Sequence, residues 1–164
     1  FASGEIMDQL TLANPVFAAY AIAASLMVLK IMLQGWITVV RMMANQGGFV
    51  NPEDAKAGPA NPKPRQAQLD LNDDVDRSRR IHRNDLENIP AFLAIGLLFV
   101  LVAPPLAAAQ WLFYGFAAAR LAHTLAYSTA QSHEVRAVFY TIGSLIVIAM
   151  GVWVLAAAIP YALG

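Results

Sequence analysis

Polar and ionisable side chains recur at helical spacing in three segments of an otherwise apolar chain. Within each segment they stand three, four or seven residues apart, which places them on one face of a helix. We expect these faces, with Arg41 from an earlier apolar segment, to reach the same level of a helical bundle. The three groups are Arg80, Arg83, Asn84 and Glu87; then Arg120, His123 and Tyr127; then Arg136 and Tyr140.

These residue types indicate a site for an anion with more than one carboxylate. Several arginines would converge there with few acids at equal depth, and guanidinium binds carboxylate through two parallel hydrogen bonds. Glu87 could bind an ammonium group. A ligand with carboxylates, an ammonium and amide groups is a short acidic peptide. Ionisable side chains at membrane depth are costly, so a functional site is the default hypothesis for them.

Structural roles are the alternative for each of these residues. The segment from Arg83 to Glu87 could be a polar network between helices. Arg80 could anchor the chain at the membrane interface, as we expect for the neighbouring arginines at positions 77 and 79. His123 could be an interhelical hydrogen-bond partner, while Tyr127 and Tyr140 could be interface aromatics.

Lys30 interrupts the apolar surface of the first long apolar segment. Its side chain either extends to the membrane interface or pairs with Asp85 or Glu87, and we favour a structural role for it.

The composition is that of a membrane protein. Of 164 residues, 58% are hydrophobic and only 13% are charged, against about 25% charged in soluble proteins. The apolar residues form long blocks. The chain has no cysteine, which excludes disulfides, thiolate metal sites and a cysteine nucleophile. We expect no metal site and no nucleic acid partner.

The elements that position the polar residues are four long helices. The sequence predicts an all-α membrane protein, a four-transmembrane-helix up-and-down bundle, with residues 1–164 as a single domain. A polar loop at about 47–73, either partly disordered or folded, contains several prolines that prevent a long helix. The helices are expected at about 15–46, 74–102, 106–128 and 133–162.

Local signals set the expected helix ends. Asn14 before Pro15 is a helix start, and Gly47-Gly48 should end that helix. The second helix should begin near Asp73, with Asp73 or Asp74 as its cap.

Lysine and arginine are abundant from residue 44 to residue 83 and at Arg136, and absent from the first 29 residues, the 103–110 turn and the C-terminus. The positive-inside rule therefore places the long loop in the cytoplasm and both termini outside.

Three motifs resemble those of one family. The segment Arg80–Ile89 (RIHRNDLENI) resembles the second-helix signature of the MAPEG family, the membrane-associated proteins of eicosanoid and glutathione metabolism. Asn51–Asp54 (NPED) and Arg120–Tyr127 (RLAHTLAY) resemble motifs of its microsomal glutathione transferase and prostaglandin E synthase branch. Arg136 falls where that branch keeps its catalytic arginine. The similarity runs from about Pro15 to Gly151.

The resemblance implies a homotrimer of four-helix subunits that binds glutathione between adjacent subunits near the cytoplasmic side. It suggests a bacterial-type member in the inner membrane, with the active site facing the cytoplasm. Arg136 is implied to be catalytic, holding the glutathione sulfur as a thiolate. The residues implied to bind glutathione are Arg41, Arg80, Arg83, Asn84, Glu87, His123, Tyr127 and Tyr140.

The implied function is a glutathione transferase that attacks lipophilic electrophiles dissolved among the membrane lipids, with peroxidase activity toward lipid hydroperoxides as a further option. A prostaglandin-E-synthase-like isomerase and a non-catalytic lipid-binding partner protein stay open as alternatives. Ala137 stands where the synthase has serine and the transferase has alanine, which favours the transferase. A small multidrug-type transporter would need an acid deep in the first helix, where this chain has Lys30.

Overall fold

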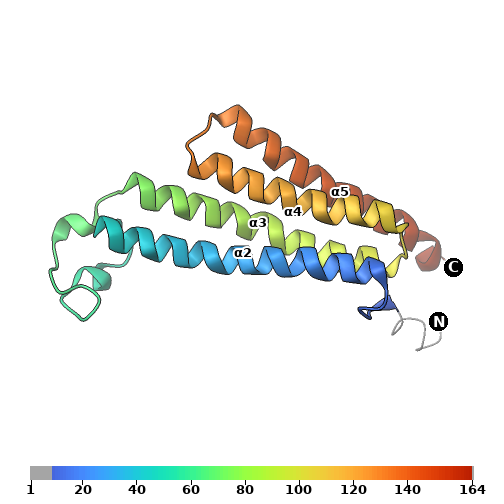
Figure 1. Ribbon diagram of the computed structural model, residues 1–164, viewed down its shortest axis with the longest axis horizontal. Helices are drawn as coiled ribbons and strands as arrows, with labels where there is room; N and C mark the ends of the chain where they lie inside the picture. The colour runs from blue at the N-terminus through green and yellow to red at the C-terminus, as the bar shows by residue number, and fades with distance from the viewer. Residues whose placement is uncertain (1–8, 164) are drawn as a thin grey trace.

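Four long helices run alternately up and down the length of the molecule (Figure 1). The computed structural model describes residues 9–163, so the ends of the expected 1–164 domain lie outside the described residues. The observed bounds lie within one residue of the ranges expected from the sequence. The helices are α2 (Pro15–Asn45), α3 (Asp73–Leu101), α4 (Leu106–Ser128) and α5 (His133–Leu163).

The start of α2 and the end of α5 lie at one end of the bundle, and the loop between α2 and α3 lies at the other (Figure 1). α2 and α3 reach further toward the loop end than the α4–α5 turn does. This difference leaves the first turns of α3 beside α2 and the loop.

Three of the helices, α2, α3 and α5, contain a stretch long and apolar enough to cross a membrane. α4 carries Gln110, Arg120 and His123, which lower its hydropathy. Its 23 residues correspond to about 34 Å of helix, enough for a fourth crossing. That fourth crossing stays a prediction.

An aromatic core fills the bundle at the end away from the loop. Phe92 of α3 stacks on Phe116 of α4, with ring centroids 4.1 Å apart. The Tyr20 hydroxyl of α2 donates to the Leu93 carbonyl at 2.8 Å. A β-carbon at Gly96 would lie 2.9 Å from the Tyr20 ring, so this close contact between α2 and α3 requires glycine. Aromatic packing and the interhelical hydrogen bond of Tyr20 fix the helices against one another.

The loop between α2 and α3 is folded, which was one of the two alternatives expected for it. It contains two short 3-10 helices, η1 (Pro52–Ala55) and η2 (Gln66–Leu69). The buried side chains of Asn61 and Gln68 exchange two hydrogen bonds, of 2.7 and 3.1 Å. On the α3 side, Arg79 donates to the Gly48 carbonyl at 2.5 Å. These contacts hold the loop against the ends of α2 and α3.

The helix starts follow side-chain capping. Asn14 accepts from the backbone N–H of Val16 at 3.0 Å, which confirms the expected start of α2. At α3 the expected cap was wrong: Asn72, not an aspartate, accepts from the backbone N–H groups of Asp74 and Val75. Asparagine is among the preferred caps, and the aspartates that follow occupy the first turn, where the helix dipole favours negative charge.

The end of α2 also differs from the expected glycine stop. Gln46 itself takes the left-handed conformation, with φ of 46°, and its N–H bonds back to the carbonyls of the last turn. Gly48, with φ of 70°, comes two residues later and turns the chain into the loop. The helix therefore ends just before the two glycines.

Candidate functional site

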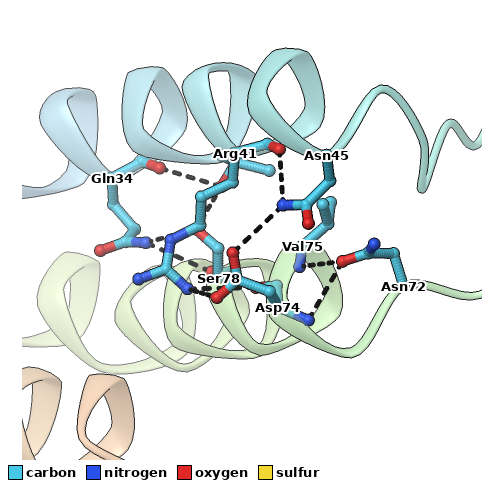
Figure 2. Close-up of polar contacts among 8 residues, drawn as sticks. Gln34, Arg41, Asn45, Asn72, Asp74, Val75 and Ser78 are labelled. Carbon is cyan, nitrogen blue, oxygen red and sulfur yellow. Dashed lines mark hydrogen bonds and ion pairs between the residues drawn. The ribbon is translucent and has the colours of Figure 1, made fainter.

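A seam of hydrogen bonds joins α2 to α3 at the loop end (Figure 2). The Gln34 amide donates to the Ser78 hydroxyl at 2.8 Å, and the Thr38 hydroxyl lies 2.8 Å from the same oxygen. All three residues are buried. In the described part of the chain, none of their buried side-chain atoms lacks a partner. We refer to Gln34, Thr38 and Ser78, together with the pair Arg41–Asp74, as the α2–α3 seam.

Arg41 lies at the exposed end of this seam. Its guanidinium donates to the Asp74 carboxylate at 2.5 Å and to the Asp74 carbonyl at 3.1 Å. Asn45 donates to the other carboxylate oxygen at 3.3 Å. Figure 2 shows Arg41 and Asn45 pointing from α2 toward Asp74. The arginine implied to bind a ligand is thus neutralised within its own chain.

Deeper in the bundle, three charged side chains from three helices meet. Lys30 of α2 pairs with one oxygen of Asp85 of α3, and Arg120 of α4 donates to the other oxygen at 2.8 Å. Asp85 and Arg120 are fully buried. We refer to Lys30, Asp85 and Arg120 as the buried triad. Its two cations share one anion, so both Lys30 and Arg120 depend on Asp85 for neutralisation.

The triad settles the pairing of Lys30, for which Asp85 and Glu87 were both open. The two acids stand two residues apart, which is about 200° around a helix. Asp85 shares the core face with Ile81 and Ile89, whereas Glu87 is exposed on the opposite side of α3. Lys30 therefore reaches Asp85 only.

Asn84 adjoins the triad. Its side-chain oxygen accepts a hydrogen bond from Arg120 Nη2 at 2.5 Å. Arg120 Nε and Nη1 are buried and have no hydrogen-bond partner among the described residues, and the same is true of His123 Nδ1. Asn84 is the one predicted ligand-binding residue of α3 that turns toward α4.

The start of α5 brings three predicted site residues together. The guanidinium of Arg136 lies over the Tyr127 ring, 4.5 Å from its centroid, and the Tyr127 and His123 ring centroids are 5.5 Å apart. Of the Arg136 side-chain donors, only Nε has a partner among the described residues, the Ser132 carbonyl at 3.3 Å. We refer to His123, Tyr127 and Arg136 as the α4–α5 group. Its arginine has two terminal nitrogens available for an anion.

The other predicted site residues of α3 and α5 face outward. Arg83, Glu87 and Tyr140 are exposed, and none has a side-chain hydrogen bond or ion pair within the described part of the chain. Arg80 is also exposed and lies 3.9 Å from Asp76, one turn earlier. In this structure these residues are not brought into contact with the α4–α5 group.

The expectation of arginines with few acids at equal depth was wrong. Four arginines pair with an aspartate of α3: two lie one helical turn after their aspartate on the same face of α3, and the other two reach α3 from α2 and α4. Arg83 and Arg136 have no carboxylate partner within the described residues. The ion pairs are Arg41 with Asp74, Arg79 and Arg80 with Asp76, and Arg120 with Asp85.

Sequence reasoning placed Arg120 on the correct helix face but counted it among the arginines of an anion site, whereas it pairs with Asp85; it also left the partner of Lys30 undecided. One signal could have found the triad. Ile81, Asp85 and Ile89 stand four residues apart, so Asp85 had to lie on an apolar, core-facing stripe where a charge needs a partner.

The chain matches known proteins along most of its length. The model of the MAPEG family matches residues 19–156. The chain is 37% identical over 137 residues to microsomal glutathione S-transferase 1 of Bos taurus, covering 84% of this chain and 87% of the relative. It is 36% identical over 146 residues to the Homo sapiens protein of the same name, covering 89% and 90%. Identity to prostaglandin E synthase of Homo sapiens is 32% over 136 residues, covering 83% and 86%.

Proposed function

The chain belongs to the MAPEG family, and we propose that it is a membrane-bound glutathione transferase that acts as a homotrimer. Relatives named glutathione S-transferase and prostaglandin E synthase support a glutathione-dependent activity for an integral membrane protein of this kind. The three apolar helices support its place in the bilayer.

The observation that carries the proposal is the unneutralised guanidinium of Arg136. It is held over the Tyr127 ring, and no carboxylate within the described residues pairs with it. The aromatic face fixes the cation without using its hydrogen-bond donors. Arg136 is therefore the arginine that we assign to the sulfur of glutathione.

The proposed chemistry begins with the thiol. A free thiol has a pKa of about 8.5, so only a few per cent is thiolate at pH 7. A guanidinium beside the sulfur, in a site shielded from water, favours the anion and lowers that pKa. The thiolate then attacks an electrophilic carbon, the leaving group departs, and the thiol proton has passed to solvent. The absence of cysteine from the chain fits a nucleophile supplied by the cosubstrate.

The outward direction of Arg83, Glu87 and Tyr140 supports a site completed by a neighbouring subunit. Charged and polar side chains at membrane depth require partners, and these three have none among the described residues. We propose that they bind glutathione across the trimer interface, with Asn84, His123 and Tyr127 contributing from the same cleft. Arg41 and Arg80 are the weakest members of this set, because Asp74 and Asp76 already pair with them.

The proposed orientation places the loop and the glutathione site in the cytoplasm and both termini outside. Lys56, Lys63 and Arg65 in the folded loop support it, since basic residues favour the cytoplasmic side. We further propose a bacterial-type member in an inner membrane, with lipophilic electrophiles or lipid hydroperoxides entering from the bilayer.

A prostaglandin-E-synthase-like isomerase is the second candidate, supported by the 32% identity to that enzyme. Ala137, next to Arg136, favours the transferase. A non-catalytic lipid-binding protein would not need an arginine left free for a thiolate.

The proposal is tested by binding of glutathione to the purified protein in nanodiscs, followed by a screen for conjugation of an aryl halide and reduction of a lipid hydroperoxide. We expect binding and at least conjugation. Absence of binding would reject every glutathione-dependent function. Binding with no conjugation, but with isomerisation of a prostaglandin endoperoxide, would select the second candidate.

A further inference from the structure

Asn84 and Arg120 form a contact that determines how Asn84 can meet a ligand. Arg120 Nη2 donates to the Asn84 side-chain oxygen at 2.5 Å. A guanidinium has donors and no acceptor, so the atom of the amide that faces it must be the oxygen. The Asn84 –NH₂ group is then directed away from Arg120, and it has no hydrogen-bond partner within the described residues.

We propose that Arg120 is a positioning residue, which turns the Asn84 amide so that it presents two N–H donors to an acceptor of the bound peptide, a carboxylate or an amide carbonyl. This inference rests on the proposed glutathione function. Without Arg120 the amide can rotate by half a turn and present its oxygen instead. An oxygen facing a carboxylate or carbonyl repels it, so the two orientations differ in their affinity for the same ligand.

The buried triad gives Arg120 a fixed position from which to act. Both hydrogens of Nη2 are used, one by Asn84 and one by Asp85 Oδ1 at 2.8 Å. Lys30 holds the second oxygen of Asp85. Arg120 Nε and Nη1 have no partner in the described part of the chain, so within it Asp85 and Asn84 are the only acceptors that orient the guanidinium.

The position of Asn84 agrees with this role. It is part-buried and lies between the buried triad and the exposed pair Arg83 and Glu87 on α3. An amide in this place joins the interior ion pairs of the buried triad to a face whose charged side chains have no partner among the described residues. The triad thus acts on the ligand through one side chain that touches both.

The test is a double-mutant cycle on glutathione affinity, measured by calorimetry on the trimer in nanodiscs. The variants are Arg120→Met, Asn84→Ala and the double variant, with Arg120→Lys as the conservative replacement. Met removes the donor but leaves Lys30 and Asp85 as a neutral pair, which favours folding. Thr124→Val on the same helix is the matched control, because its buried hydroxyl has no partner in the described residues and should leave the Kd unchanged.

We expect Asn84→Ala to weaken glutathione binding about tenfold and Arg120→Met about fivefold, the range for loss or misdirection of one hydrogen bond to a charged group. In the Asn84→Ala background, Arg120→Met should cause no further loss of glutathione affinity. As a single change, Arg120→Lys should weaken binding less than Arg120→Met does, because lysine keeps a donor. Equal losses in both backgrounds would show that Arg120 acts independently of Asn84 and would overturn the proposal, as would an unchanged Kd in Arg120→Met.

If Arg120→Met does not assemble, Asn84→Asp carries the test. Aspartate keeps the acceptor for Arg120 but has no donor to offer the ligand, so it should bind glutathione no better than Asn84→Ala. Wild-type affinity in Asn84→Asp would overturn the positioning role. Failure of the unmodified protein to bind glutathione would instead reject the proposed function itself, and the positioning role with it.

Discussion

The α2–α3 seam and the α4–α5 group both place polar side chains near the loop end of the bundle, yet they differ in where their hydrogen bonds go. In the seam, Gln34, Thr38 and Ser78 bond to one another. In the α4–α5 group, Arg136 lies over an aromatic face, and among the described residues its side chain donates a hydrogen bond through Nε alone. A side chain whose partners lie in its own chain stabilises the fold, whereas one with unused donors is available to a ligand. At this depth of the bundle, the comparison distinguishes polar side chains that bond to one another from polar side chains that keep donors for a ligand.

The buried triad belongs with the seam in this comparison, and removing its anion should have the largest effect. Asp85→Asn leaves Lys30 and Arg120 buried without a carboxylate. We expect a loss of about 3–5 kcal/mol in the free energy of unfolding, measured by denaturation in detergent. Glu87→Gln is the control, because that carboxylate is exposed on the other side of α3 and should change stability by less than about 0.5 kcal/mol. Equal stability of the two variants would show that the triad does not support the fold.

Arg136→Ala should have the opposite profile, with a large effect on activity and a small one on stability. Without the guanidinium the pKa of the glutathione thiol should return toward about 8.5, at which only about 3% is thiolate at pH 7. We expect a loss of about 10- to 30-fold at pH 7 that shrinks as pH rises through 8.5, because more thiolate then forms unaided. The pH–rate profile of aryl halide conjugation measures this, with Arg77→Ala as a change of equal charge outside the site. Conjugation at the wild-type rate would remove Arg136 from the mechanism.

Ser78→Ala probes the seam by removing the hydroxyl that serves both Gln34 and Thr38. We expect a loss of about 1–3 kcal/mol in unfolding free energy, since buried polar groups lose their partner. Glutathione affinity should not change. Ser144→Ala is matched to it, because among the described residues that exposed hydroxyl bonds to backbone carbonyls of its own helix alone. A change in glutathione affinity in Ser78→Ala without loss of stability would break the distinction between the two regions.

Asp74→Asn should have the smallest effect, although it removes an ion pair of 2.5 Å. The Asp74 side chain is about half exposed. Exposed ion pairs contribute about 0.2–1 kcal/mol, and added salt weakens them. Unfolding at low and high ionic strength should show a small loss at low salt that disappears at high salt. A loss as large as that of Ser78→Ala would place Asp74 among the buried partners of the seam.

Sequence reasoning predicted the four helices well because long apolar segments and helix breakers are local signals. It was weaker on contacts between helices. Arg120 and His123 were placed on one helix face, but the carboxylate and amide that bind Arg120 belong to α3. The cap of α3 was missed by one residue, since Asn72 and Asp73 are both good caps and only backbone geometry selects between them.

By itself, the sequence determined that this is an apolar, helical chain with the MAPEG motifs, with no thiol of its own and with its charges gathered near one membrane face. Helical periodicity also fixed which residues share a face of their own helix. Only the tertiary structure decided that Lys30 pairs with Asp85, that Arg120 takes the oxygen of Asn84, and that Arg41 pairs with a carboxylate whereas Arg136 has no carboxylate partner among the described residues. The physical reason is that periodicity relates residues within one helix, whereas ion pairing depends on how neighbouring helices are rotated and how far their side chains reach.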